Sequence, residues 1–361
     1  MSMQKQPLFY YKRPVFGLDV GSQSIKVMQL EHTKHGAKVV GYGNTKTTEK
    51  IIKDGVIVAV PETAKLIDQL LANELKGRLT TNRVVMGIPV SHVFTRVLTL
   101  PQMSKKELHA AVELEVEQSV PLAPKELYFD YEATGGLDSK EVLVRMVAAP
   151  RKIVDSYVQV CELLRLDLAL VQTNIEADSQ LCMLYEDMKR GTPYIIVDVG
   201  GVSVDVGILD ATLRVTGTVD TGGEHFTDAV AKVLHVSRTK AQHIKITSGI
   251  NAGPQQEKMK AALDPLFDKV VEEIKRIKKF YTNRVQQEAD ITQIVITGGG
   301  ANVPGLGDYL TNATRIPTKV SSPWTKHISF GHLQSPDVAD LPRFLTAAGL
   351  ALAKDEDVMH D

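Results

Sequence analysis

Two similar turns place acidic, glycine and serine residues together at two points of the chain. They are Asp19–Ser24 and Asp198–Ser203, and each connects two apolar runs of the kind that form strands. Glycine lets the backbone approach a ligand closely, so the N–H groups and serine hydroxyls of such a turn can surround a phosphate. The aspartate can bind a divalent cation directly or through water. The turns therefore predict two β-hairpins that hold one polyphosphate from opposite sides.

The first turn supplies a carboxylate, two hydroxyls and a cation for this chemistry. We assign Asp19 to a magnesium ion that it reaches through water. Gly21, Ser22 and Ser24 are assigned to phosphate oxygens. Lys26 follows the turn and can neutralise phosphate charge, although a solvated lysine on an alternating strand gives the same pattern.

The second turn repeats this set about half a chain later, as expected if one ancestral lobe was duplicated. We assign Asp198 to the same magnesium ion. Gly200, Gly201 and Ser203 are assigned to phosphate. Aspartate before glycine also caps turns without any ligand, and either turn alone is compatible with that role. Their occurrence as a symmetric pair favours the metal role for both aspartates.

A third glycine-rich turn follows another apolar run, Ile294–Thr297. Gly298, Gly299 and Gly300 are followed by Asn302, so the backbone of this turn can approach a flat ligand. We predict that it binds adenosine. The turn does not match GxGxxG and the chain has no GxxxxGK[ST] loop, which argues against Rossmann and P-loop folds.

The order of these three turns resembles the phosphate-1, phosphate-2 and adenosine motifs of the actin, sugar kinase and Hsp70 superfamily. Within it, further segments resemble the type IV pilus assembly protein PilM family, and the cell-division protein FtsA is similar but more distant. These segments are Leu100–Glu115, Val120–Leu122 and Phe129–Tyr131, and the whole resemblance covers roughly Val15 to Ala353. It implies an α/β, actin-like (ribonuclease H-like) duplicated two-lobe fold that binds ATP with Mg²⁺.

The resemblance also implies an insertion of the FtsA and PilM type, called 1C, in the first lobe. Local patterns agree: Ser104 and Glu107 form a capping-box signature before a predicted helix. Strand-like runs lie at Arg83–Val90 and Glu141–Ala148, and Arg343–Ala353 is predicted to be a closing helix. The expected ranges are 14–82 with 151–190 and 343–354 for lobe one (1A), 83–150 for the α+β subdomain 1C, and 192–342 for lobe two (2A), with a helical 2B insertion at about 224–290.

Lobe two contains further residues that the resemblance assigns to the base and ribose of the nucleotide. They lie in a Gly-Gly-Glu sequence and in the helix-like stretch after it. A surface helix with solvated lysines gives the same pattern, so both interpretations stay open. The residues are Gly222, Gly223, Glu224, Lys240 and Lys245.

Glu176 is the candidate catalytic residue, because phosphoryl transfer needs a group that positions water or accepts a proton. It corresponds in order to the helix that connects the lobes in the resembled fold, and it can orient water. An N-cap at Asn174 followed by acidic charge in the first helical turn explains the same residues structurally, and we favour that reading. We therefore predict ATP binding with at most slow ATPase activity.

The composition fits a two-lobed protein in a reducing cytoplasm. With 361 residues and 43% hydrophobic content, the chain exceeds one ordinary core. A net charge of −1 provides no dense basic field for nucleic acid or anionic lipid. Cys161 and Cys182 lie in apolar, helix-like patterns, where reduced core thiols are expected. The ten histidines show no HxxxH or HExxH spacing, which argues against structural zinc.

We expect no direct membrane insertion. The longest apolar run, Ile195–Leu209, contains two aspartates and breaks at glycines, and the N-terminus has no signal-peptide pattern. The acidic stretch Asp355–Asp357 differs from the basic amphipathic helix expected of FtsA-like proteins. Membrane attachment is therefore expected to come from a partner.

The family resemblance implies a scaffold function in type IV pilus assembly at the inner face of the membrane. A short N-terminal cytoplasmic peptide of the membrane protein PilN is expected to dock between lobe one and 1C, with other inner-membrane assembly proteins as further partners. Two alternatives stay open: a small-molecule kinase with the same nucleotide cleft, and a filament-forming protein like FtsA. A kinase needs a catalytic aspartate in an acceptor pocket, and the insertion offers no convincing one beyond Asp130, which lies in a strand-like run.

Overall fold

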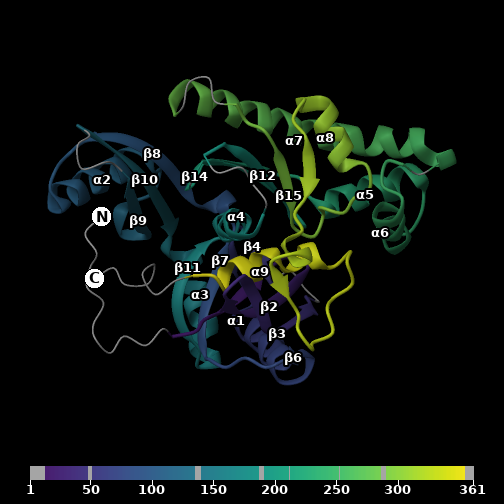
Figure 1. The fold of residues 1–361 in the computed structure, drawn as a ribbon, viewed down its shortest axis with the longest axis horizontal. Helices are drawn as coiled ribbons and strands as arrows, with labels where there is room; N and C mark the ends of the chain where they lie inside the picture. The colour runs from purple at the N-terminus through teal and green to yellow at the C-terminus, as the bar shows by residue number, and fades with distance from the viewer. Residues whose placement is uncertain are drawn as a thin grey trace.

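The computed structural model describes residues 13–47, 51–134, 140–186, 191–210, 212–251, 253–285 and 290–353. These residues form two lobes, each built on its own large sheet, and a smaller three-stranded sheet at one side (Figure 1). Residues 48–50, 187–190 and 354 of the range predicted for lobe one, and Asp355–Asp357, lie outside the described residues.

The first lobe is built on a seven-stranded sheet. Its strands are β1 (Phe16–Val20), β2 (Ser24–Thr33), β3 (Gly36–Lys46), β6 (Lys76–Gly77), β7 (Arg83–Ile88), β11 (Asp167–Thr173) and β17 (Ile328–Ser329). They lie in the order β11-β7-β1-β2-β3-β17, with β6 paired to β3. The antiparallel pair β1 and β2 is the predicted first hairpin, and β7 runs parallel to β1 on its other side.

Helices cover both faces of this sheet. They are α1 (Val60–Gln69, continued by a π-helical turn at Leu70–Glu74), α3 (Arg151–Leu164), α4 (Asn174–Tyr185) and α9 (Leu345–Leu350). Phe16 and Leu18 of β1 pack with Ile67 of α1 and Tyr157 of α3 on one face. On the other face, α4 and α9 pack together and lie between the two lobes (Figure 1). A small hairpin of β4 (Ile52–Lys53) and β5 (Val56–Ile57) contacts α3.

The closing helix α9 is shorter than predicted, because a 3₁₀ turn over Leu341–Phe344 precedes it. Its glycine is required by close packing. A Cβ atom added to Gly349 would lie 2.1 Å from the carbonyl oxygen of Ala177 in α4. On the sheet side, a Cβ added to Gly17 would lie 2.0 Å from the carbonyl oxygen of Ala347. The close backbone approach at both points packs α9 tightly between β1 and α4.

Strand β7 corrects one expectation about the insertion. The run Arg83–Val90 was assigned to subdomain 1C, but β7 lies between β1 and β11 in the first sheet. Five of its residues, Val84 to Ile88, are buried together without alternation, as in a central parallel strand that is covered on both faces. Such a run does not reveal to which sheet it belongs. The inserted sheet therefore begins at Phe94.

The insertion is a three-stranded antiparallel sheet with one covering helix. Its elements are β8 (Phe94–Pro101), α2 (Lys105–Ser119), β9 (Leu127–Thr134) and β10 (Glu141–Pro150), with the strands in the order β8-β10-β9. The capping box is confirmed: the Ser104 hydroxyl accepts from the Glu107 N–H, and the Glu107 carboxylate accepts from the Ser104 N–H. Leu108, Val112 and Val116 of α2 are buried against the sheet.

The second lobe repeats the design of the first. Its sheet contains β12 (Tyr194–Val199), β13 (Val204–Asp210), β14 (Thr212–Val219), β15 (Ile294–Thr297) and β16 (Thr318–Val320), in the order β14-β13-β12-β15-β16. As in lobe one, the first strand is antiparallel to the next and parallel to a later one. Its helices are α5 (Gly223–Leu234), α6 (Arg238–Thr247), α7 (Gln256–Arg284) and α8 (Leu306–Thr314). The two lobes therefore share one architecture, as expected for a duplicated two-lobe α/β fold.

Candidate functional site

The two predicted hairpin turns have the same backbone geometry. The N–H of Gly21 donates to the carbonyl oxygen of Ser24 at 3.1 Å, and the N–H of Gly200 donates to that of Ser203 at 3.0 Å. The residues opposite the two aspartates differ. Lys26 pairs with Asp19 across the first hairpin, and its Nζ donates to Asp19 Oδ2 at 2.7 Å. In the second hairpin the residue opposite Asp198 is another acid, Asp205.

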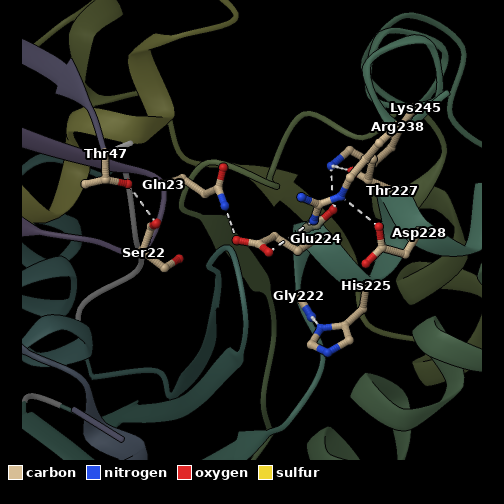
Figure 2. Close-up of polar contacts among 11 residues, drawn as sticks. Ser22, Gln23, Thr47, Gly222, Glu224, His225, Thr227, Asp228, Arg238 and Lys245 are labelled. Atoms are coloured by element: carbon tan, nitrogen blue, oxygen red, sulfur yellow. Dashed lines mark hydrogen bonds and ion pairs between the residues drawn. The ribbon is translucent and has the colours of Figure 1, made fainter. Parts of the chain in front are cut away.

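The turns meet across the space between the lobes. A Cβ atom added to Gly201 would lie 2.6 Å from Ser22 Oγ and 3.1 Å from Gln23 Cγ. Gln23 also reaches α5 of lobe two, where its Nε2 donates to Glu224 Oε1 (Figure 2). Arg238 holds the other oxygen of Glu224 at 3.1 Å. The first turn therefore contacts both the second turn and the start of α5.

Four aspartates are buried beneath these turns. Asp19, Asp178, Asp198 and Asp205 are each at most 8% exposed. Burial raises the pKa of Asp198 well above its ordinary value, and the charges of the other three aspartates raise it further. Burial likewise raises the pKa of Asp178 to about 7 and that of Asp205 to about 6, although threonine hydroxyls donate to both carboxylates. Lys26 offsets part of this negative charge.

This acidic cluster fits a magnesium ion held through water. Carboxylate oxygens are hard ligands that Mg²⁺ prefers, and the ion keeps several waters in most sites. In the part of the chain that the structure describes, no three acidic, histidine or cysteine side chains are close enough to ligate one ion directly. Asp19 and Asp198 would therefore act on the ion through its waters. When bound, the ion would neutralise phosphate charge.

Asp178 leads to a prediction about stability. Its pKa of about 7 in the folded protein lies above the ordinary value of 3.8, so the folded state binds a proton that the unfolded state releases. Stability is then highest at low pH and is lost as the pH rises toward 7. Without Mg²⁺ and nucleotide, the free energy of unfolding should fall by on the order of 2 kcal/mol between pH 5 and pH 8 because of this group. Urea denaturation at both pH values measures it.

Asp178→Asn removes this titration and should reduce the pH dependence of stability, to which the raised pKa values of Asp198 and Asp205 also contribute. Asp130→Asn, at an exposed position of β9, is the control and should leave it unchanged. Equal pH dependence in wild type and Asp178→Asn would contradict the prediction.

The start of α5 supports the second turn. The N–H groups of Gly223 and Glu224 donate to the carbonyl oxygens of Gly200 and Gly201, at 2.9 and 2.8 Å. A Cβ added to Gly222 would lie 2.7 Å from the carbonyl oxygen of Gly201. Gly222 and Gly223, at the start of α5, therefore hold the second turn in position, independently of any contact with a nucleotide.

The two predicted lysines of α6 lie in different environments. Lys245 is buried, and its Nζ donates to the Gly223 carbonyl at 2.7 Å and to Thr227 Oγ1 at 2.9 Å (Figure 2). Burial lowers its pKa to about 8, and the charges of Arg343 and Arg238 lower it further. Lys240 is exposed in the first turn of α6. The structure therefore brings Lys245, and not Lys240, into contact with the start of α5.

The third glycine turn packs on the second hairpin. The N–H of Gly300 donates to the carbonyl oxygen of Val199 at 2.9 Å. Gly298 has a φ of +81°, and a Cβ there would lie 2.1 Å from Asp198 Oδ1. Asn302 donates from Nδ2 to the carbonyl oxygen of Ala339 at 2.8 Å, which ties the turn to the C-terminal segment of lobe one. Strand β17 pairs with β3 in the first sheet, so the chain returns to lobe one by Ile328 and not at residue 343 as expected. The predicted adenosine turn is therefore in direct contact with a predicted metal residue.

Glu176 is held by the insertion. Arg145 of β10 donates from Nη2 to Glu176 Oε1 at 2.6 Å and to Glu132 Oε2 at 3.2 Å. The predicted N-cap at Asn174 is wrong by one residue, since Thr173 is the N-cap and makes no side-chain cap. The carboxylate of Glu176 is thus an ion-pair partner that joins 1C to the interlobe helix α4.

Several residues of this region were missed in the sequence. Asp205 could have been found from its place opposite Asp198, because the hairpin register follows from the turn. Gln23, Arg145 and Asp178 carry no such local signal. Each acts through a partner on another element, which only the tertiary structure reveals.

The family described as type IV pilus assembly protein PilM matches residues 17–355. The cell division protein FtsA of Borreliella burgdorferi is 25% identical over 362 residues, which cover 95% of this chain and 76% of that protein. FtsA of Enterococcus faecalis is 21% identical over 356 residues, covering 85% of this chain and 78% of the relative. These matches extend over both lobes and the insertion.

Solved structures show the same fold. A PilM-PilN type IV pilus biogenesis complex superposes with a TM-score of 0.81 at 20% identity, covering 97% of this chain and 100% of the matched chain. MreB5 of Spiroplasma citri bound to AMPPNP superposes with a TM-score of 0.54 at 12% identity, covering 94% and 95%. No helix within the described ranges combines the length and the apolar character needed to cross a bilayer.

Proposed function

The chain belongs to the type IV pilus assembly protein PilM family, and from this premise we propose that it is an ATP-binding scaffold that recruits a PilN-like membrane protein. Two features of the structure together support this proposal. Two similar turns, of a kind suited to phosphate, face each other between the lobes, and a groove lies at the insertion. The scaffold would act at the cytoplasmic face of the inner membrane, attached through its partner. Other inner-membrane pilus proteins are proposed as further partners.

The nucleotide would lie between the two hairpin turns and the third glycine turn. Asp19 and Asp198 would orient the waters of Mg²⁺, and Lys26 and Lys245 would offset phosphate charge. The glycines leave room that any side chain would fill, as the 2.1 Å approach of a Cβ on Gly298 to Asp198 illustrates. This donor set of buried carboxylates, lysines and glycine turns supports Mg-ATP as the ligand.

A groove at the insertion supports peptide docking. Its cavity of about 580 Å³ suits a short peptide. Phe94 and Met146 of the insertion and Val90 of lobe one supply apolar walls, and Thr216 and Thr218 of β14 close the other side. Both β8 and β14 are edge strands, so an extended peptide can hydrogen-bond to their free edges.

The groove predicted between lobe one and 1C is therefore also bounded by lobe two. Thr218, in its wall, donates to Asp205 Oδ1 at 2.7 Å. Asp205 lies opposite Asp198 in the second hairpin. Asp205 and Thr218 therefore connect the proposed metal site to the groove. We propose that bound nucleotide changes the affinity for the peptide through this connection.

We expect slow turnover of ATP, because Glu176 is engaged in an ion pair. Its carboxylate is paired with Arg145 at 2.6 Å, which opposes a role as general base. Asp130 of the insertion is exposed and accepts from the Tyr131 N–H, which gives no support to a kinase acceptor site. ATP would therefore serve as a bound ligand more than as a substrate.

Calorimetry with a synthetic N-terminal peptide of the PilN-like protein tests this function. We expect binding, and at least about a fivefold change in peptide affinity when Mg-ATP is present, the lower end of ordinary coupling between sites. Thr218→Val should bring the two affinities together while peptide and ATP still bind. A scrambled peptide is the control. Failure of the native peptide to bind under both conditions would contradict the scaffold function.

A further inference from the structure

Arg343 lies where the C-terminal segment of lobe one crosses the third glycine turn. It belongs to the 3₁₀ turn just before α9. A Cβ atom added to Gly299 would lie 3.5 Å from Arg343 Cγ and 3.9 Å from its Nε. The bond from Asn302 to the Ala339 carbonyl holds the two segments together at 2.8 Å. The arginine side chain is therefore packed along the open face of Gly299.

The guanidinium of Arg343 keeps donors available for a ligand. Its ion pair with Asp340, in an i,i+3 arrangement, is long at 3.4 Å, and the side chains are 35% and 48% exposed. Exposed pairs of this kind contribute little energy. A guanidinium has five N–H donors, so one long contact leaves most of them for a ligand.

Positively charged side chains from both lobes lie near Arg343. Arg343 is the largest charge contribution to the lowered pKa of Lys245, so these cations of lobe one and lobe two lie close enough to repel each other. Arg343 also lines a cavity of about 180 Å³ with Ser24, Lys26 and Lys76. Lys26 is the residue whose Nζ contacts Asp19. Two acids, Glu74 and Asp340, lie on the same cavity wall and offset part of the charge.

We propose that Arg343 binds phosphate oxygens of the nucleotide from the lobe-one side, opposite Lys245 of lobe two. This rests on the proposed ATP site. An anion between the two cations would relieve their repulsion, and the planar guanidinium can donate two parallel N–H bonds to one phosphate. Because Arg343 lies in the 3₁₀ turn that leads into α9, such a contact joins the nucleotide to the helix that packs on α4 and β1.

Calorimetric titration of Mg-ATP, Mg-ADP and adenosine separates this role from packing. Arg343→Ala should weaken ATP and ADP binding by about 10- to 100-fold, the range for one charged hydrogen-bonding group. Arg343→Lys should lose less, because it keeps the charge. Adenosine binding should not change. Arg276→Ala is the matched control, since Arg276 also forms an i,i+3 ion pair but lies on α7 with 65% exposure.

Asp340→Asn provides a second measurement that does not depend on the folding of Arg343 variants. It removes the carboxylate that competes for the guanidinium, so ATP should bind a few-fold more tightly. No ATP binding by the wild type would overturn the ATP site itself. Wild-type binding with equal affinity in Arg343→Ala, or an equal loss for adenosine and ATP, would overturn only the role of Arg343.

Discussion

Asp198→Asn is expected to lower Mg-ATP affinity on the order of 100-fold or more and at the same time to stabilise the ligand-free protein. The carboxylate is 8% exposed and lies near three other aspartates, so its negative charge is unfavourable until a cation is bound. Asparagine keeps the shape and removes that charge. The free energy of unfolding at pH 8 should therefore rise, whereas calorimetry should show the loss of magnesium-dependent ATP binding.

Asp19→Asn should lose ATP affinity in the same way but without gaining stability. Asp19 is paired with Lys26 at 2.7 Å, and the substitution leaves that lysine, 13% exposed, without its carboxylate. The two variants thus differ in the sign of their effect on stability although they share one effect on binding. Asp130→Asn serves as the control for both. Unchanged ATP affinity in Asp19→Asn and Asp198→Asn would contradict the paired-turn assignment.

Deletion of residues 95–147, with a short glycine linker, is expected to abolish binding of the PilN-like peptide and to preserve Mg-ATP binding. The deletion removes most of β8, all of α2 and β9 and most of β10. Phe94 and Ala148 are paired neighbours in the inserted sheet, so a short linker can join them. Both large sheets and the three turns stay intact. Calorimetry with peptide and with Mg-ATP measures the two activities on the same preparation.

A longer deletion, of residues 83–150, is the structural control. It also removes β7, which lies between β1 and β11 in the first sheet, so lobe one should fail to fold. Circular dichroism distinguishes the two deletions. Peptide binding by the folded 95–147 deletion variant would place the docking site outside the insertion.

Local patterns in the sequence were enough to predict the turns and the capping box of this protein. The turns at Gly21 and Gly200 follow from glycine placement between two apolar, strand-like runs, and the Ser104–Glu107 capping box follows from a spacing of three residues. The order of the three glycine turns then indicated the duplicated two-lobe fold. These features depend on neighbours in the chain, so sequence alone carries them.

Tertiary structure alone decided which distant side chains meet. The continuous apolar run of β7 could not reveal its sheet, because burial on both faces removes the alternation that marks an orientation. The contacts of Arg145 with Glu176, Thr297 with Asp178, and Arg343 with Gly299 join residues from separate elements. Such contacts depend on how sheets and helices pack, which a single sequence does not encode in any local spacing. The turns themselves were therefore predictable, whereas the charges that surround them were not.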